Sequence, residues 1–97
     1  MKAVLIIFNQ ALTEKAEYLL DHLNIKGFTL WPIVYGRGSD TGRPHMGTHT
    51  WPETNSGILT IVNESIVDTL LEKVKIINEI NTDVGIRAFV WDIEKTI

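Results

Sequence analysis

The sequence of 97 residues contains no cysteine, which excludes disulfides, thiolate metal sites and a cysteine nucleophile. No stretch approaches the ~20 apolar residues that a membrane-spanning helix needs. The apolar run 3–8 is too short for a signal peptide, and Asn9-Gln10 follows it in place of a small-residue cleavage site. We therefore expect a cytoplasmic protein that does not insert into a membrane.

The chain also lacks an excess of positive charge. It carries 12 acidic residues against nine Lys and Arg, for a formal net charge of -3. Because nucleic-acid binding needs a basic surface, we expect no nucleic-acid partner. With 44% hydrophobic residues, the composition is that of an ordinary globular protein with one core. The sequence thus predicts a single domain over residues 1–97.

Short apolar runs alternate with two amphipathic helical patterns. Strands are predicted at 3–8, 28–35, 58–62 and 86–91. Thr13 is expected to cap the first helix, which Asn24 ends, and Asn63 or Ser65 to cap the second, which ends near Asn81. The order βαββαβ predicts an α+β, ferredoxin-like fold, in which two helices cover one face of a four-stranded antiparallel sheet.

Two consequences follow for this sheet. Pro32 cannot donate to a β-ladder, so the strand at 28–35 should have an edge, a bulge or an early end there. Several aromatic residues on the strands should leave apolar surface pointing away from the helices: Phe28, Trp31, Tyr35, Phe89 and Trp91. Self-association is the economical way to cover such a face.

The connection between the second and third strands, residues 36–55, is the most unusual segment. It holds four of the seven glycines and two of the three histidines. A connection of roughly 20 residues is far longer than a usual hairpin loop, and such loops are commonly functional or disordered. Met46 and Trp51 supply apolar anchors that disordered linkers lack. We interpret the segment as a functional loop in which these two residues contact a partner, although Trp51 is also suited to pack on a neighbouring subunit.

Arg37 and Arg43 lie among glycines of this loop. Glycine lets backbone N–H groups approach an anion, so this part of the loop is a candidate phosphate cradle. No Gly-Lys-Ser/Thr sequence is present, which excludes a P-loop. The alternative is a solvated glycine-rich loop with exposed arginines.

His45 and His49 are spaced four apart, with Asp40 and Glu53 nearby. Imidazole and carboxylate together suit a divalent metal such as Zn, Ni or Cu. The alternative is a pair of polar loop histidines. His22, next to Asp21, is interpreted as an exposed histidine at a helix end.

Catalysis has little support in the sequence. Ser39, Thr48 and Thr50 are hydroxyls near His45 and His49, but a catalytic triad is defined by geometry, and any polar loop supplies these residue types. We predict that the protein is not an enzyme.

Three segments resemble the PII signal-transduction family, the nitrogen regulatory proteins. They are Gly27-Phe28-Thr29 at the start of the second strand, Tyr35-Gly36-Arg37-Gly38 at the base of the long loop, and Phe89 to Ile97 at the end. The long loop is similar to the family's T-loop. The resemblance implies a homotrimer that binds ATP or ADP, and often 2-oxoglutarate, in clefts between subunits. It also implies signalling through the loop to a protein partner such as a membrane transporter or an enzyme.

The resemblance assigns candidate residues. Arg87 falls about where the family has its phosphate-binding lysine, and the segment 81–87 holds no other cation. The family's modified tyrosine has no counterpart in the loop, so the chain is identified as a divergent member. The candidate ligand-binding residues for a small anion are Thr29, Gly36, Arg37, Gly38, Arg43 and Arg87.

Two other functions suit the same fold. A CutA-like trimer would bind or respond to a divalent metal through His45 and His49. A module of the ACT type would bind an amino acid, but such modules usually accompany an enzyme.

Overall fold

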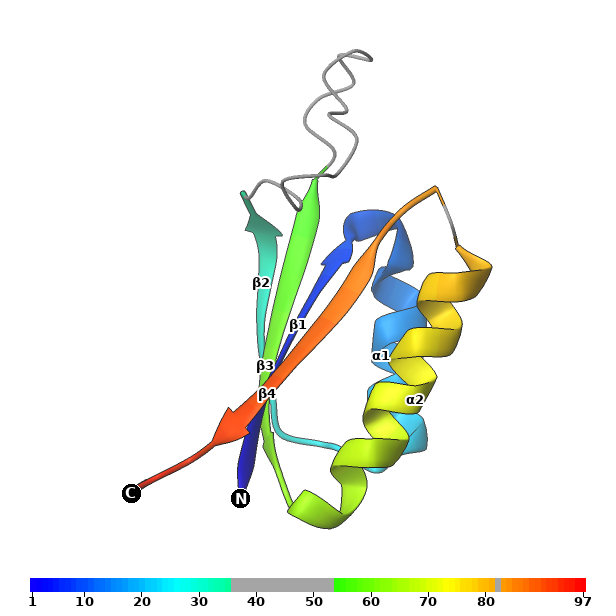
Figure 1. Ribbon diagram of the computed structural model, residues 1–97. Helices are drawn as coiled ribbons and strands as arrows, with labels where there is room; N and C mark the ends of the chain where they lie inside the picture. The colour runs from blue at the N-terminus through cyan, green and yellow to red at the C-terminus, as the bar shows by residue number, and fades with distance from the viewer. Residues whose placement is uncertain (36–53, 82) are drawn as a thin grey trace.

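The computed structural model describes residues 1–35, 54–81 and 83–97 (Figure 1). Its elements follow the predicted order βαββαβ, with a short 3-10 helix before the first α-helix. They are β1 (Lys2–Asn9), η1 (Gln10–Leu12), α1 (Thr13–His22), β2 (Thr29–Val34), β3 (Asn55–Val62), α2 (Glu64–Ile80) and β4 (Ile86–Asp92).

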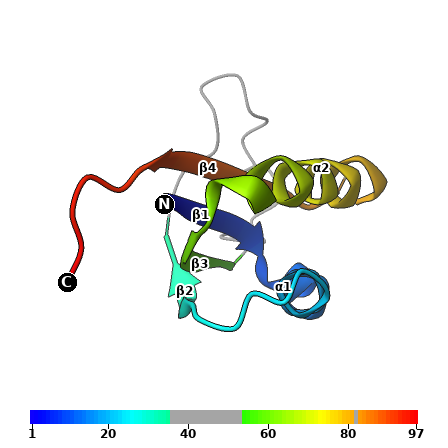
Figure 2. The same cartoon turned by 90° about the horizontal axis from the view of Figure 1, so that it is seen from below.

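The four strands form one antiparallel sheet in the order β2-β3-β1-β4. The central strands β1 and β3 pair along their whole length, from Lys2 with Val62 to Asn9 with Asn55. Both helices lie on the same side of the sheet (Figure 2). The ferredoxin-like prediction is therefore confirmed.

The core lies between the sheet and the helices, and strand alternation selects its members. Every second residue of a strand points towards the helices. The buried strand residues are Val4, Ile6, Phe8, Ile58, Val62 and Ile86, and the helices cover them with Ala16, Leu19, Leu20, Val67, Leu70 and Val74. Thr60 is a polar member of this layer, and its hydroxyl donates to the Gly27 carbonyl at 2.7 Å. The core thus leaves the other face of the sheet without helical cover.

Strand β2 is an edge strand, and its pairing with β3 is irregular around Pro32. The register shifts between Trp31 and Val34, as expected for a proline that cannot donate. The Ser56 hydroxyl donates to the Pro32 carbonyl at 2.7 Å and so satisfies an acceptor beside the irregularity. The predicted irregularity at Pro32 is confirmed.

Several boundaries differ from the sequence prediction. The strand predicted at 28–35 is shorter, so Phe28 and Tyr35 lie just outside β2. Asn55, assigned above to the end of the long loop, is the first residue of β3, because β1 extends far enough to pair with it. Thr13 is not an N-cap: Leu12 occupies that position, and the Thr13 hydroxyl donates to the Gln10 carbonyl at 2.7 Å. The 3-10 turn before α1, capped by Asn9, places Thr13 inside the helix.

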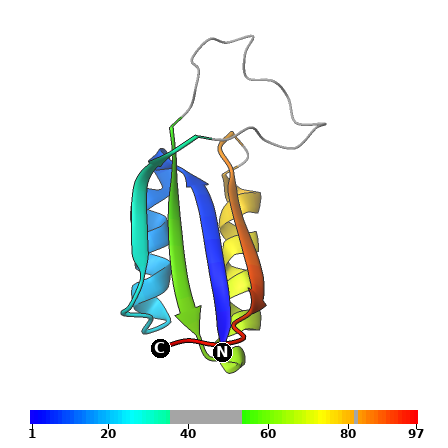
Figure 3. The same cartoon turned by 90° about the vertical axis from the view of Figure 1, so that its left-hand side faces the viewer.

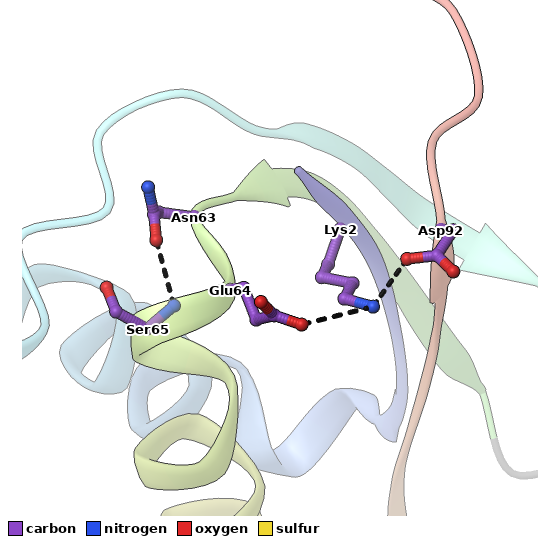
Figure 4. Close-up of polar contacts among 5 residues, drawn as sticks. All are labelled: Lys2, Asn63, Glu64, Ser65 and Asp92. Atoms are coloured by element: carbon purple, nitrogen blue, oxygen red, sulfur yellow. Dashed lines mark hydrogen bonds and ion pairs between the residues drawn. The ribbon is translucent and has the colours of Figure 1, made fainter.

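The other helix ends match the prediction. Asn24 has a φ of 59°, the left-handed conformation in which Asn is tolerated after a helix. The Asn63 side chain accepts from the Ser65 N–H at 2.9 Å and caps α2 (Figure 4). At the other end of α2, the Asn81 amide donates to the Ile77 carbonyl at 2.8 Å.

Lys2 links three elements at the end of the sheet that holds both termini (Figure 4). Its ammonium donates to Asp92 on β4 and lies 3.5 Å from Glu64 at the start of α2. The hydrogen bond to Asp92 raises the pKa of Lys2 above its ordinary value, and the same bond lowers the pKa of Asp92. The Asp92 contribution to stability is therefore complete above about pH 4 and is lost as the pH falls through the lowered pKa. The Lys2 contribution is lost only as the pH rises above about 10.4.

We expect Asp92→Asn to lower the melting temperature slightly at pH 7, because exposed ion pairs contribute little. The difference from wild type should shrink below about pH 4. Melting curves between pH 3 and pH 8 measure both effects, with Glu94→Gln as the control that removes a nearby carboxylate. A difference that stays constant at pH 3 would mean that Asp92 acts by something other than its charge.

Candidate functional site

No described helix covers the face of the sheet opposite α1 and α2 (Figure 3). Most of the side chains that the strand alternation directs to this face are apolar. The strand register arranges its side chains in three rows across β2, β3, β1 and β4. The rows are Trp31–Gly57–Ile7–Arg87, Thr29–Leu59–Leu5–Phe89 and, without a β2 member, Ile61–Ala3–Trp91. We call these eleven residues the open face. Ile61, Phe89 and Trp91 are each more than two-fifths exposed. The sequence predicted this exposure for the two aromatic residues.

Gly57 shapes the first row. A Cβ at this position would lie 3.3 Å from Ile7 Cδ1, 3.6 Å from Val34 Cγ1 and 3.7 Å from Trp31 Cε3. The missing side chain therefore leaves room for Ile7 and the Trp31 indole to approach the backbone of β3. Gly57 lies near the end of the sheet at which β2 ends and β3 begins (Figures 1 and 3).

Arg87 is the one cation of the open face. It is exposed, and its guanidinium carbon lies 6.0 Å from the centroid of the Phe89 ring, at the outer limit of a cation–π contact. Among the described residues, no carboxylate forms an ion pair with it. Its role in binding an anion stays a prediction.

The backbone just before Arg87 is held from two sides. The Ile86 N–H donates to the Asn78 side-chain oxygen of α2 at 3.2 Å. The Gly85 carbonyl accepts from the Asn9 N–H of β1 at 2.9 Å. These two bonds fix where β4 begins, and so they fix the direction in which Arg87 leaves the sheet.

Thr29 lies on the same face as Arg87 but at the opposite edge. It belongs to β2 and Arg87 to β4, the two outer strands. Three strand spacings separate them, about 14 Å. The structure thus does not bring these two candidate residues together within one chain, and a single phosphate cannot contact both unless two chains contribute.

The remaining candidate residues lie outside the described residues. They are Gly36, Arg37, Gly38, Arg43, His45, Met46, His49 and Trp51. Within 1–35, 54–81 and 83–97, the structure contains no group of three or more His, Asp and Glu side chains placed to hold a metal ion. In the same part of the chain, no helix has the length and apolar character needed to cross a membrane. His22 is the last residue of α1 and is exposed, as predicted.

The junction between β1 and η1, residues Asn9 and Gln10, is hydrogen-bonded to the starts of both β3 and β4. The Asn9 N–H donates to the Gly85 carbonyl, two residues before Arg87. The Gln10 N–H donates to the Thr54 carbonyl at 2.8 Å, directly before β3. Two adjacent residues at the junction, Asn9 and Gln10, thus bind the backbone just before β4 and the backbone just before β3. Nothing in the sequence marks this junction, because it works through backbone groups that every residue except proline carries.

Comparisons with known proteins agree with this fold. The family model described as nitrogen regulatory protein P-II matches residues 1–97. CPII from Thiomonas intermedia K12, in a structure bound to ADP, AMP and acetate, is 28% identical with a TM-score of 0.77, covering 99% of this chain and 88% of that chain. A structure of CPII with ADP, AMP and bicarbonate gives 30% identity and a TM-score of 0.72 over 95% and 90% of the two chains. A third structure, of CPII bound to ADP and bicarbonate, gives 26% identity and a TM-score of 0.67, covering 97% of this chain and 88% of that chain. No curated protein matches this chain.

Proposed function

The chain belongs to the nitrogen regulatory protein P-II family, and on this premise we propose that it is a homotrimeric regulator. It binds an adenine nucleotide, together with a small carboxylate-like anion, in the clefts between its subunits. Its long loop, 36–55 in the sequence prediction, transmits the occupancy of these clefts to a partner protein such as a transporter or an enzyme. Its role is regulatory rather than catalytic.

The observation that carries this proposal is the placement of Arg87 and Thr29 on one open, apolar face but at opposite edges. A face with Leu59, Ile61, Phe89 and Trp91 exposed or half-buried is favoured as an interface between copies. Association through this face brings the β2 edge of one subunit towards the β4 edge of the next. Thr29 and Arg87 then face a common ligand from two chains.

The ligand class follows from charge and from the CPII structures. Arg87 suits a phosphate or a carboxylate, since its guanidinium forms paired hydrogen bonds with either. CPII has been solved with ADP and AMP, and with bicarbonate or acetate as a second anion. Arg37 and Arg43 of the loop carry further positive charge. An adenine nucleotide is therefore our first choice of ligand, with bicarbonate as the companion anion.

The β1–η1 junction supplies a route from the cleft to the loop. A ligand bound to Arg87 restrains the start of β4. The Gly85 carbonyl, just before β4, accepts a hydrogen bond from the Asn9 N–H. The neighbouring Gln10 N–H holds Thr54, where the loop returns to β3. Ligand binding and loop conformation are therefore coupled through one short segment of rigid backbone.

A thermal melt of the purified protein tests the ligand. We expect ADP at a hundredfold excess over its dissociation constant to stabilise the native state by about 2.7 kcal/mol, which raises the midpoint by roughly 10 °C. The panel should contain ATP, ADP, AMP, 2-oxoglutarate, bicarbonate and acetate, with Zn, Ni and Cu. A shift with metals alone, abolished by His45→Ala and His49→Ala, would replace our proposal by a metal-responsive function.

A further inference from the structure

The outer surface of the helical layer carries a groove between α1 and α2, on the opposite side of the molecule from the open face. It is about 490 Å³ in volume, within the usual range of ligand pockets. Leu19 and Ile77 line it from the side of the core, and Tyr18 and Ile76 are its more exposed apolar residues. The groove plays no part in the proposed nucleotide site.

The apolar walls of the groove are unusually open for a helical surface. Tyr18 is 70% exposed and Ile76 is 45% exposed. The Tyr18 ring stacks on His22, one turn further along α1, with centroids 5.8 Å apart and planes 17° apart. This stack extends the α1 wall as a flat aromatic surface. Ile80, one turn beyond Ile76 on α2, continues the apolar line towards the end of that helix.

The charged residues stand at the two ends of the groove. The helices run antiparallel, so the first turn of α1 lies beside the last turns of α2 (Figure 1). Lys15 therefore marks one end, next to Glu14, and Lys73 with His22 marks the other. Lys15 and His22 are seven residues apart on α1, about 10 Å along its axis. The groove is thus an apolar centre about two helical turns long, with Lys15 beside the Glu14 carboxylate at one end and Lys73 beside His22 at the other.

We propose that this groove binds an amphipathic helix of a partner protein through an apolar stripe flanked by two acidic residues. An apolar pair at i+3 and i+4 fits between Tyr18 and Ile76, as in other helix-in-groove complexes. Carboxylates at i and i+7 lie on the same helical face, two turns apart, and so reach Lys15 and Lys73. The two lysines set the preference for an acidic helix, and the apolar centre supplies most of the affinity.

The probe is a 16-residue acetylated and amidated peptide with Glu-x-x-Leu-Leu-x-x-Glu at its centre and Ala or Gln elsewhere. Its twin has Lys in place of both Glu. Titration of the full-length ¹⁵N-labelled protein should shift the amide signals of Tyr18, His22 and Ile76, and the acidic peptide should bind at least tenfold more tightly than its twin. Equal affinity for both peptides, or shifts confined to the open face, would overturn the proposal.

Variants of the protein test the charge and the apolar centre separately. Lys15→Glu with Lys73→Glu should reverse the preference between the two peptides, and Ile76→Gln should weaken both by tenfold or more. Lys75→Glu is the control for each single change, because it replaces one Lys by Glu on α2 outside the groove. An unchanged preference in the double variant would refute the charge argument. Binding of the wild type to anionic vesicles in preference to the acidic peptide would assign the groove to a lipid surface, and a smaller particle for Ile76→Gln would assign it to a second copy of this chain.

Discussion

Ile61→Asp is expected to convert the proposed trimer into a folded monomer. Ile61 lies on the central strand β3, points to the open face and is 41% exposed in the single chain. An Asp there costs the isolated subunit only about 1 kcal/mol of strand preference. In an assembly that covers the open face, each copy would bury a carboxylate at a cost of several kcal/mol. Light scattering should therefore report a mass near the 11.0 kDa of one chain in place of three times that value.

Ile80→Asp provides the matched control for this experiment. Ile80 is also an exposed apolar residue, but it lies at the end of α2 in the helical layer. It should leave the mass unchanged. Circular dichroism of Ile61→Asp should retain the wild-type content of helix and strand. If Ile61→Asp has the same mass as wild type, the open face is not the subunit interface.

Arg87→Ala is expected to weaken ADP binding by about 10- to 100-fold, because a hydrogen bond to a charged group contributes roughly 1.5–3 kcal/mol. The melting temperature without ligand should barely change, since Arg87 is exposed and forms no ion pair with any other described residue. Arg87→Lys should bind with intermediate affinity, because it keeps the charge but loses the paired geometry. Isothermal titration calorimetry measures the dissociation constant of ADP for wild type, Arg87→Ala and Arg87→Lys. Lys26→Ala, which removes an exposed cation before β2, is the control.

Co-expression tests whether two subunits share one site. A Thr29 variant that blocks binding, such as Thr29→Glu, and Arg87→Ala should each lack the high-affinity site. Mixed trimers should recover it in those clefts where Thr29 of one subunit faces Arg87 of another. No recovery in mixed trimers would mean that the two residues do not serve the same cleft. If Arg87→Ala binds ADP as tightly as wild type, the anion site does not include Arg87 of β4. This result would leave the proposal for the α1–α2 groove unchanged.

The sequence alone determined the order of the elements, the type of fold and the uncovered face. Strand and helix periodicity depend on neighbours two to four residues apart, so the stripes Val4–Phe8 and Val67–Val74 are visible without a structure. Caps and breakers such as Asn24, Pro32 and Asn63 act within one or two residues, and for that reason their effects were predicted correctly.

Pairing between distant segments decided what the sequence could not. Asn55, Ser56 and Gly57 look like loop residues, yet they are strand because β1 pairs with them along its full length. Thr13 lost its predicted capping role because η1 starts the helical turn three residues earlier. Tertiary pairing overrode local preference at the start of β3, whereas the shift at Thr13 follows from the local cap at Asn9.

The functional geometry also depends on the tertiary structure. The sequence suggested both Thr29 and Arg87, but only the strand order β2-β3-β1-β4 places them at opposite edges of one face. The Asn9–Gln10 junction and the α1–α2 groove arise from segments that are distant in sequence. Such features depend on backbone hydrogen bonds and on helix packing, which leave no periodic or compositional signal in the chain, so only the folded structure reveals them.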